Sequence, residues 1–165
     1  MCRVLNSLLV VAAIGGLGAA AVAARSASPP IEGVWRAVEV TTTGPGARTI
    51  GTVQPNLSII TARHYSHIDI HAEGPRPALA DAARASADEL REVWGPVTAE
   101  AGSYELSRGS FVTRPVVAKN PAAMAQGSFT SYSYRIAGDT MWLTQQRDQR
   151  GVVSNPTTIK LARVE

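Results

Sequence analysis

The chain has 165 residues, of which 45% are hydrophobic, 18% charged and 5% aromatic, and its formal net charge is +3. This length suits one compact domain and excludes two domains of ordinary size. The modest charge and ordinary hydrophobic content exclude a disordered chain, and the single cysteine excludes a disulfide-rich scaffold.

The first 24 residues have the pattern of a secretory signal peptide. Arg3 precedes a run without charges from Leu8 to Ala24, and an Ala-x-Ala pattern at Ala21 and Ala23 comes before Arg25. An uncleaved membrane anchor is the alternative, because the run approaches the ~20 residues that a span needs. The Ala and Gly content of the run favours cleavage. We therefore expect a periplasmic or secreted protein that touches a membrane only through this segment, if it is uncleaved.

Cleavage would also change the cysteine content and the net charge of the chain. It would remove Cys2, the one cysteine, and leave 15 basic against 13 acidic residues, a net charge of +2. The remaining arginines are scattered singly along the chain and do not cluster with aromatic residues. A nucleic-acid surface needs such clustering, so nucleic acid is excluded as a partner. No cofactor is predicted.

Residues 25–30 (RSASPP) are predicted to be a linker, and residues 31–165 are predicted to form one domain of many short strands. Strand-forming segments separated by turn residues occur at 33–43, 56–61, 64–71, 97–106, 110–118, 129–136, 140–146 and 157–164. No alternation of strand and helix supports a parallel sheet. About eight short strands with hairpin-like links predict an all-β, antiparallel sandwich or barrel.

One helical insertion is predicted at residues 78–94, where hydrophobic residues recur with helical spacing. Ser86 and Glu89 have the spacing of a capping box, which allows a second helical piece to begin there. We expect the apolar stripe to pack against the barrel wall or one end, or to form a lid over a cavity. The opposite face carries four acidic and two basic side chains, which argues against an anionic membrane surface.

Six landmarks occur in order along the domain. They are Gly33-Val34-Trp35 and then the segments 64–66 (HYS), 75–77 (PRP), 101–104 (AGSY), 118–121 (AKNP) and 160–165 (KLARVE). In these landmarks the chain resembles the small bacterial lipocalin-like domain family over about residues 31–165. The resemblance implies an antiparallel up-and-down lipocalin-like β-barrel of about eight strands with an internal cavity. It implies a fold and a cavity more than a function.

The resemblance also implies how the barrel closes. Trp35, after Gly33, is expected to plug one end, with Arg163 packed over its ring and joining the first and last strands. A cation over an aromatic ring contributes roughly 0.5–2 kcal/mol when partly desolvated. Larger lipocalins carry a disulfide, which the cleaved chain would lack. The barrel must therefore hold by its core and its hydrogen-bonded closure.

The segment 64–71 contains all three histidines of the chain. Side chains alternate along a strand, so His64, Ser66 and two isoleucines share one face. The isoleucines predict that this face points inward, which would place His64 and Ser66 in the cavity as ligand-binding residues.

The other face of the segment is predicted to be solvated. It carries Tyr65, His67, Asp69 and His71, which resemble a strip of metal ligands. However, His67 and His71 lie roughly 13 Å apart along a strand and cannot share one ion. A zinc site would also need ligands from another strand. No metal site is predicted.

Four further residues are candidates for contact with a ligand. Tyr104, Tyr132 and Tyr134 offer large rings with polar tips, which suit half-polar ligands and sheet cores equally. An inward Arg114 would bind a ligand carboxylate, whereas an outward Arg114 would be a solvated charge.

The sequence therefore predicts an exported lipocalin-like protein that binds a small, mostly apolar or amphipathic molecule, oriented by His64, Ser66 and a tyrosine. One alternative is an enzyme in the same cavity, an isomerase, cyclase or hydrolase with His64 as acid–base, although G-x-S-x-G is absent. Another is a structural or interaction protein of the envelope with a filled barrel. A cavity of at least ~300 Å³ would favour the ligand hypotheses.

Overall fold

The computed structural model describes residues 30–165. The predicted signal peptide (1–24) with Cys2, and residues 25–29 of the predicted linker, lie outside the described residues. Within the described part, no helix is both long and apolar enough to cross a membrane.

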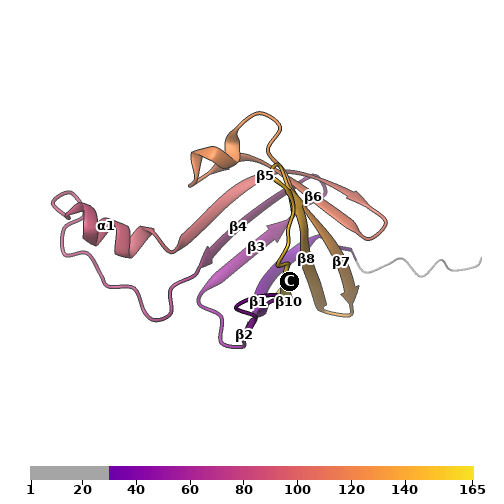
Figure 1. The fold of residues 1–165 in the computed structure, drawn as a ribbon, viewed down its shortest axis with the longest axis horizontal. Helices are drawn as coiled ribbons and strands as arrows, with labels where there is room; N and C mark the ends of the chain where they lie inside the picture. The colour runs from indigo at the N-terminus through magenta and orange to yellow at the C-terminus, as the bar shows by residue number, and fades with distance from the viewer. Residues whose placement is uncertain (1–29) are drawn as a thin grey trace, which may run out of the picture.

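Strands make up most of the regular structure (Figure 1). They are β1 (Gly33–Thr42), β2 (Arg48–Ile50), β3 (Asn56–Ile60), β4 (His64–Ile70), β5 (Val97–Ser107), β6 (Ser110–Ala118), β7 (Thr130–Ala137), β8 (Thr140–Asp148), β9 (Gly151–Val152) and β10 (Thr157–Arg163). The helices are α1 (Ala87–Trp94) and the short 3₁₀ helix η1 (Pro121–Met124).

Eight of these strands form a closed antiparallel barrel. They follow the order β1, β3, β4, β5, β6, β7, β8 and β10, and β10 pairs with both β8 and β1, which completes the ring. The predicted all-β lipocalin-like barrel with one helix is therefore confirmed. The predicted strands agree with the observed ones to within two residues at every end. The sequence missed only β2 and β9, which are too short to show an alternating pattern.

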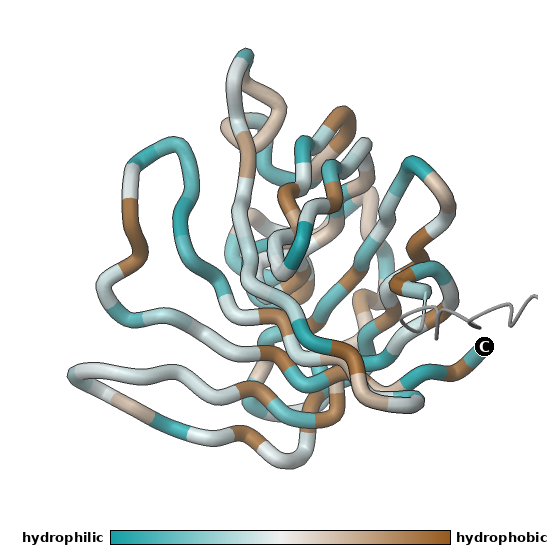
Figure 2. The backbone as a smooth tube through the Cα atoms, turned by 90° about the vertical axis from the view of Figure 1, so that its right-hand side faces the viewer, coloured by the Kyte–Doolittle hydropathy of each residue, from teal (hydrophilic) through white to brown (hydrophobic). Residues whose placement is uncertain are grey.

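The two ends of the barrel differ in their connections. At one end, which we call the plugged end, tight turns join β3 to β4, β5 to β6 and β7 to β8. At the other, which we call the loop end, longer segments at 43–55, 71–96, 119–129 and 149–156 link the strands. Hydrophobic and hydrophilic residues alternate along the backbone, as expected for strands with one face inside the barrel (Figure 2).

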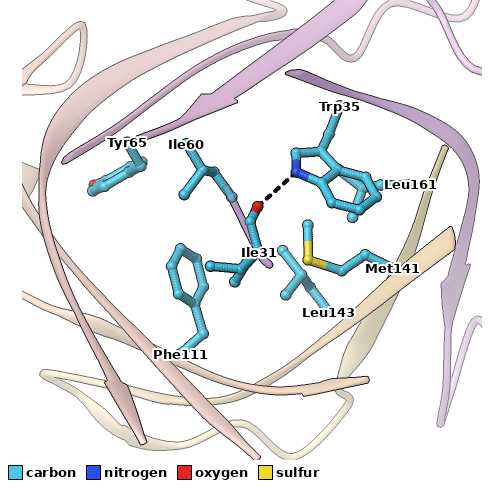
Figure 3. Close-up of a cluster of buried hydrophobic side chains, with 8 residues drawn as sticks. All are labelled: Ile31, Trp35, Ile60, Tyr65, Phe111, Met141, Leu143 and Leu161. Atoms are coloured by element: carbon cyan, nitrogen blue, oxygen red, sulfur yellow. Dashed lines mark hydrogen bonds between the residues drawn. The ribbon is translucent and has the colours of Figure 1, made fainter. Parts of the chain in front are cut away.

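The plugged end is filled by a hydrophobic cluster. Trp35 and Met141 are fully buried, and Ile31, Phe111 and Leu161 are among the residues that pack with them. Figure 3 shows these side chains gathered inside the ring of strands, with the indole Nε1 of Trp35 donating to the Ile31 carbonyl at 2.8 Å. The buried indole is thus satisfied, and the chain before β1 is folded across the end of the barrel.

Arg163 joins the first and last strands over this plug. Its guanidinium carbon lies 4.1 Å from the centroid of the Trp35 ring, and Trp35 is the register partner of Arg163 across the β1–β10 pair. The two Nη atoms donate to the Glu32 and Pro30 carbonyls, each at 2.7 Å. The predicted closure by Trp35 and Arg163 therefore has the expected geometry, with two charge-assisted hydrogen bonds added.

Gly33 is the third member of this closure. Its φ of 138° lies in a region that side chains rarely adopt. A Cβ at this position would lie 2.4 Å from Arg163 Nη1 and 2.6 Å from the Glu165 carbonyl oxygen. The Gly-x-Trp pattern therefore reflects a requirement for space beneath the arginine.

The predicted helix at 78–94 is longer than the observed helix, and its first half is wrong. Only Ala87–Trp94 is helical, and it begins at the predicted capping box: the Glu89 amide donates to the Ser86 hydroxyl at 3.3 Å, and the Ser86 amide donates to Glu89 at 2.8 Å. Before it, the Asp81 carboxylate accepts from the Ala83 amide at 2.9 Å and forms a turn. Such local bonding competes with helix formation.

The arm that carries α1 leaves the barrel between β4 and β5 (Figure 1). No residue of α1 is buried, so the helix neither packs firmly on the barrel wall nor covers the cavity as predicted. The Lys119 ammonium holds the base of the arm, because it donates to the carbonyls of Trp94, Gly95 and Val97.

We predict that Arg163→Met lowers the free energy of unfolding by about 2–4 kcal/mol, because it removes a cation–π contact and two charge-assisted hydrogen bonds. Arg135→Met is the matched control, since the Arg135 guanidinium carbon lies 3.5 Å from the Trp142 ring centroid on the exposed face. It should cost less than about 1 kcal/mol. Urea denaturation measures both, and equal losses would show that the closure adds nothing to the stacking.

Candidate functional site

The barrel encloses a cavity of about 90 Å³. Toward the plugged end its lining is apolar and includes Ile60, Phe111, Met141, Leu143 and Leu161. The polar residues of the lining include Ser58, Tyr65, His67, Asp69, Thr113 and Tyr132.

The change from apolar to polar follows the barrel axis. On the β3–β4 wall, Ile60 pairs with Tyr65 near the turn, Ser58 with His67 on the next inward row, and Asn56 with Asp69 beyond it. On the opposite wall, Met141 pairs with Leu161 and Leu143 with Ile159, before β10 reaches Thr157 at the loop end. The interior is therefore amphipathic, with its polar part toward the loop end.

Four polar residues form what we call the polar cluster: Tyr65, His67, Asp69 and Glu100. The Tyr65 hydroxyl donates to Glu100 Oε1 at 3.0 Å. His67 lies between two acids, with Nε2 3.5 Å from Asp69 Oδ2 and Nδ1 3.9 Å from Glu100 Oε1. The side chains of His67 and Asp69 are 21% and 28% exposed, so the cluster reaches solvent while most of it is enclosed.

Burial dominates the electrostatics of this region. It raises the pKa of Asp69 above its ordinary value, although the charges of His67 and His71 oppose the shift. Burial, assisted by the negative charge of Glu100, also raises the pKa of the Tyr65 and Tyr132 phenols. Both tyrosines therefore stay protonated at neutral pH and can donate hydrogen bonds inside the barrel.

The predicted orientation of β4 is wrong. Tyr65 is buried and His67 and Asp69 line the cavity, whereas His64 is exposed and Ile68 is 53% exposed. His64 is therefore not placed to contact a ligand in the cavity. Ser66 borders the cavity, but by alternation its side chain belongs to the outer face.

The physical reason lies in what each face packs against. The tight turn after Ile60 sets Tyr65 opposite it, so both enter the core together. On the outside, Ile68 pairs with Leu57 and Ala99 and forms an apolar surface strip. The pairing of Tyr65 across the tight turn thus indicates the inward face of β4 better than the two isoleucines do. The sequence therefore missed Tyr65, His67 and Asp69.

The other predicted ligand contacts fall in different places. Tyr132 lines the cavity, whereas Tyr134 packs against the hydrophobic core. Tyr104 closes the plugged end, where its ring lies 5.2 Å from that of Phe111 and its hydroxyl donates to the Thr61 carbonyl at 2.7 Å. Arg114 points outward and pairs with Glu105 at 2.9 Å, so it is not placed to bind a carboxylate in the cavity.

His71 is not one of the four residues of the polar cluster, although its charge acts on Asp69. Its Nε2 lies 3.0 Å from the Thr98 hydroxyl at the loop end. Among residues 30–165, no group of three or more His, Cys, Asp or Glu side chains is placed to hold a metal ion.

Comparison of the chain with protein-family models, curated proteins and solved structures gave no match.

The raised pKa of Asp69 predicts a pH dependence of stability. The folded protein binds the proton of the Asp69 carboxyl more tightly than the unfolded chain does. The contribution of Asp69 to the free energy of unfolding therefore falls as pH rises from 3.8, the ordinary pKa of the group, through its higher pKa in the folded protein. Asp69→Asn removes this loss. The Tm of the variant minus that of the natural protein should therefore increase across this pH range in thermal unfolding followed by circular dichroism. The exposed Asp88→Asn is the control and should show no increase; a difference that is flat or falls for Asp69→Asn would contradict the prediction.

Proposed function

We propose that the protein binds a small amphipathic molecule inside the barrel, with the apolar end toward the plug and the polar end at the polar cluster. The observation that supports this is unfilled space between an apolar floor and a polar rim. Burial of the apolar end would supply affinity at roughly 25 cal/mol per Å². His67, Asp69 and the hydroxyl of Tyr132 would orient the polar end.

The volume limits the ligand. The cavity measures about 90 Å³, well below the ~300 Å³ expected for a ligand of drug size. A dry cavity of about 150 Å³ admits benzene, so this one suits a narrower chain of a few atoms. We therefore propose a short, unbranched apolar group.

The enzyme hypothesis and the filled-barrel hypothesis receive different support. The enzyme hypothesis used His64 beside Ser66, and both belong to the outer face of β4. His67 is the histidine at the cavity, and its nearest charged groups are the carboxylates of Asp69 and Glu100. The filled-barrel hypothesis gains from the small volume, and the binding experiment below separates it from ours.

A short alcohol, n-butanol, is a suitable probe because it joins an unbranched chain to one hydroxyl. We predict saturable NMR shift changes at the methyl groups of Ile60, Leu143 and Leu161, with affinity in the millimolar range that so few atoms allow. Ala37→Leu should abolish saturation, because Ala37 is buried and lines the cavity.

The neighbouring Val38→Leu, on the exposed face, is the control and should bind as the natural protein does. If Ala37→Leu does not fold, Ser58→Val occupies the same cavity from the next strand. Shifts that rise linearly without saturation, or that persist in the filled variants, would overturn the proposal in favour of a filled barrel.

We also propose that the chain belongs to the lipocalin-like family that it resembles and that it is exported to the periplasm or beyond. The six sequence landmarks and the Ala-x-Ala pattern support these two proposals. N-terminal sequencing of protein from the periplasm or the medium should begin at Arg25. Protein that keeps Met1 or Cys2 in the membrane fraction would instead support the anchor.

A further inference from the structure

We propose that the ligand carries a positively charged end, an aliphatic ammonium group in the simplest case, which sits against Asp69 at the rim of the cavity. This inference rests on the proposed function and names the chemical class of the ligand.

The side chains at the cavity set its electrostatic preference. None of the residues that line it is a lysine or arginine, and one of them, Asp69, is an acid. A second acid, Glu100, lies behind the lining, where it accepts from the Tyr65 hydroxyl. Its side chain is only 16% exposed, so water screens its charge weakly.

The histidine does not reverse this preference. His67 has one acid on each side, and each of its ring nitrogens is within 4 Å of a carboxylate oxygen. With both carboxylates ionised, the polar cluster carries a net negative charge whether His67 is neutral or protonated. A ligand carboxylate would be repelled here, whereas a cation would relieve the repulsion between the acids.

The geometry also suits an ammonium group in particular. An ammonium has three donors and no acceptor, and Asp69, Ser58 and Tyr132 line the same cavity and each carry a side-chain oxygen that can accept. The aromatic residues Tyr65 and Tyr132 also belong to the lining, and aromatic rings attract cations. The apolar floor then accepts the alkyl chain attached to the ammonium group.

Three probes of matched chain length test the inference by the same NMR titration: n-butylamine, n-butanol and butyrate at neutral pH and constant ionic strength. We expect the amine to bind about tenfold more tightly than the alcohol, the gain of a hydrogen bond to a charged partner. Butyrate should bind most weakly. Asp69→Asn should lower the affinity for the amine far more than the affinity for the alcohol, because the amide oxygen of the asparagine still accepts from a hydroxyl but carries no charge.

Binding of the alcohol to Asp69→Asn shows that the variant keeps its cavity. Glu105→Gln is the control, because it also replaces one carboxylate of the barrel by an amide, but Glu105 points outward to Arg114. This variant should keep its preference for the amine. If the alcohol binds and the amine binds no more tightly, or butyrate binds best, the ammonium inference is wrong and the proposed cavity stands. If the alcohol fails to saturate the natural protein, the proposed function itself is wrong.

Discussion

The stacking of Arg163 on Trp35 is the interaction on which the rest of the structure depends. The two residues are register partners on the last and first strands, so their contact lies on the seam where the sheet meets itself. The same guanidinium binds two carbonyls of the segment before β1. One side chain of the last strand thus binds both the first strand and the segment directly before it, without help from a disulfide. A closed ring has no free edge strands, which protects the chain from pairing with other chains.

The plug at one end determines where unfilled space can lie inside the barrel. Because Trp35, Met141 and their neighbours fill the plugged end, the unfilled space lies between this floor and the loop end. Polar groups are tolerated there because each has a partner or reaches water, as Tyr65 does through Glu100 and His67 does by its partial exposure. The plug therefore accounts for the apolar end of the interior, and the partners of the polar groups account for the polar end.

The sequence predicted the fold better than the site, for physical reasons. Turn residues and alternation mark strand ends locally, so eight strands and the capping box at Ser86 could be predicted from short windows. The direction of β4 depended on its partners. Only the pairing of Ile60 with Tyr65 across a tight turn shows that Tyr65 enters the core. The acid Glu100 joins His67 from 33 positions away, a neighbour relation that no spacing within one strand reveals.

The closure of the barrel requires few specific residues. The partners of Arg163 before β1 are backbone carbonyls, which any residue at positions 30 and 32 would supply. Only a glycine at 33, a tryptophan at 35 and an arginine at 163 need to keep their identity at the seam. Mutations could therefore accumulate in the four long connections and on the outer wall while this barrel persists. A sequence that keeps these three residues could therefore differ almost everywhere else and still close the barrel in the same way.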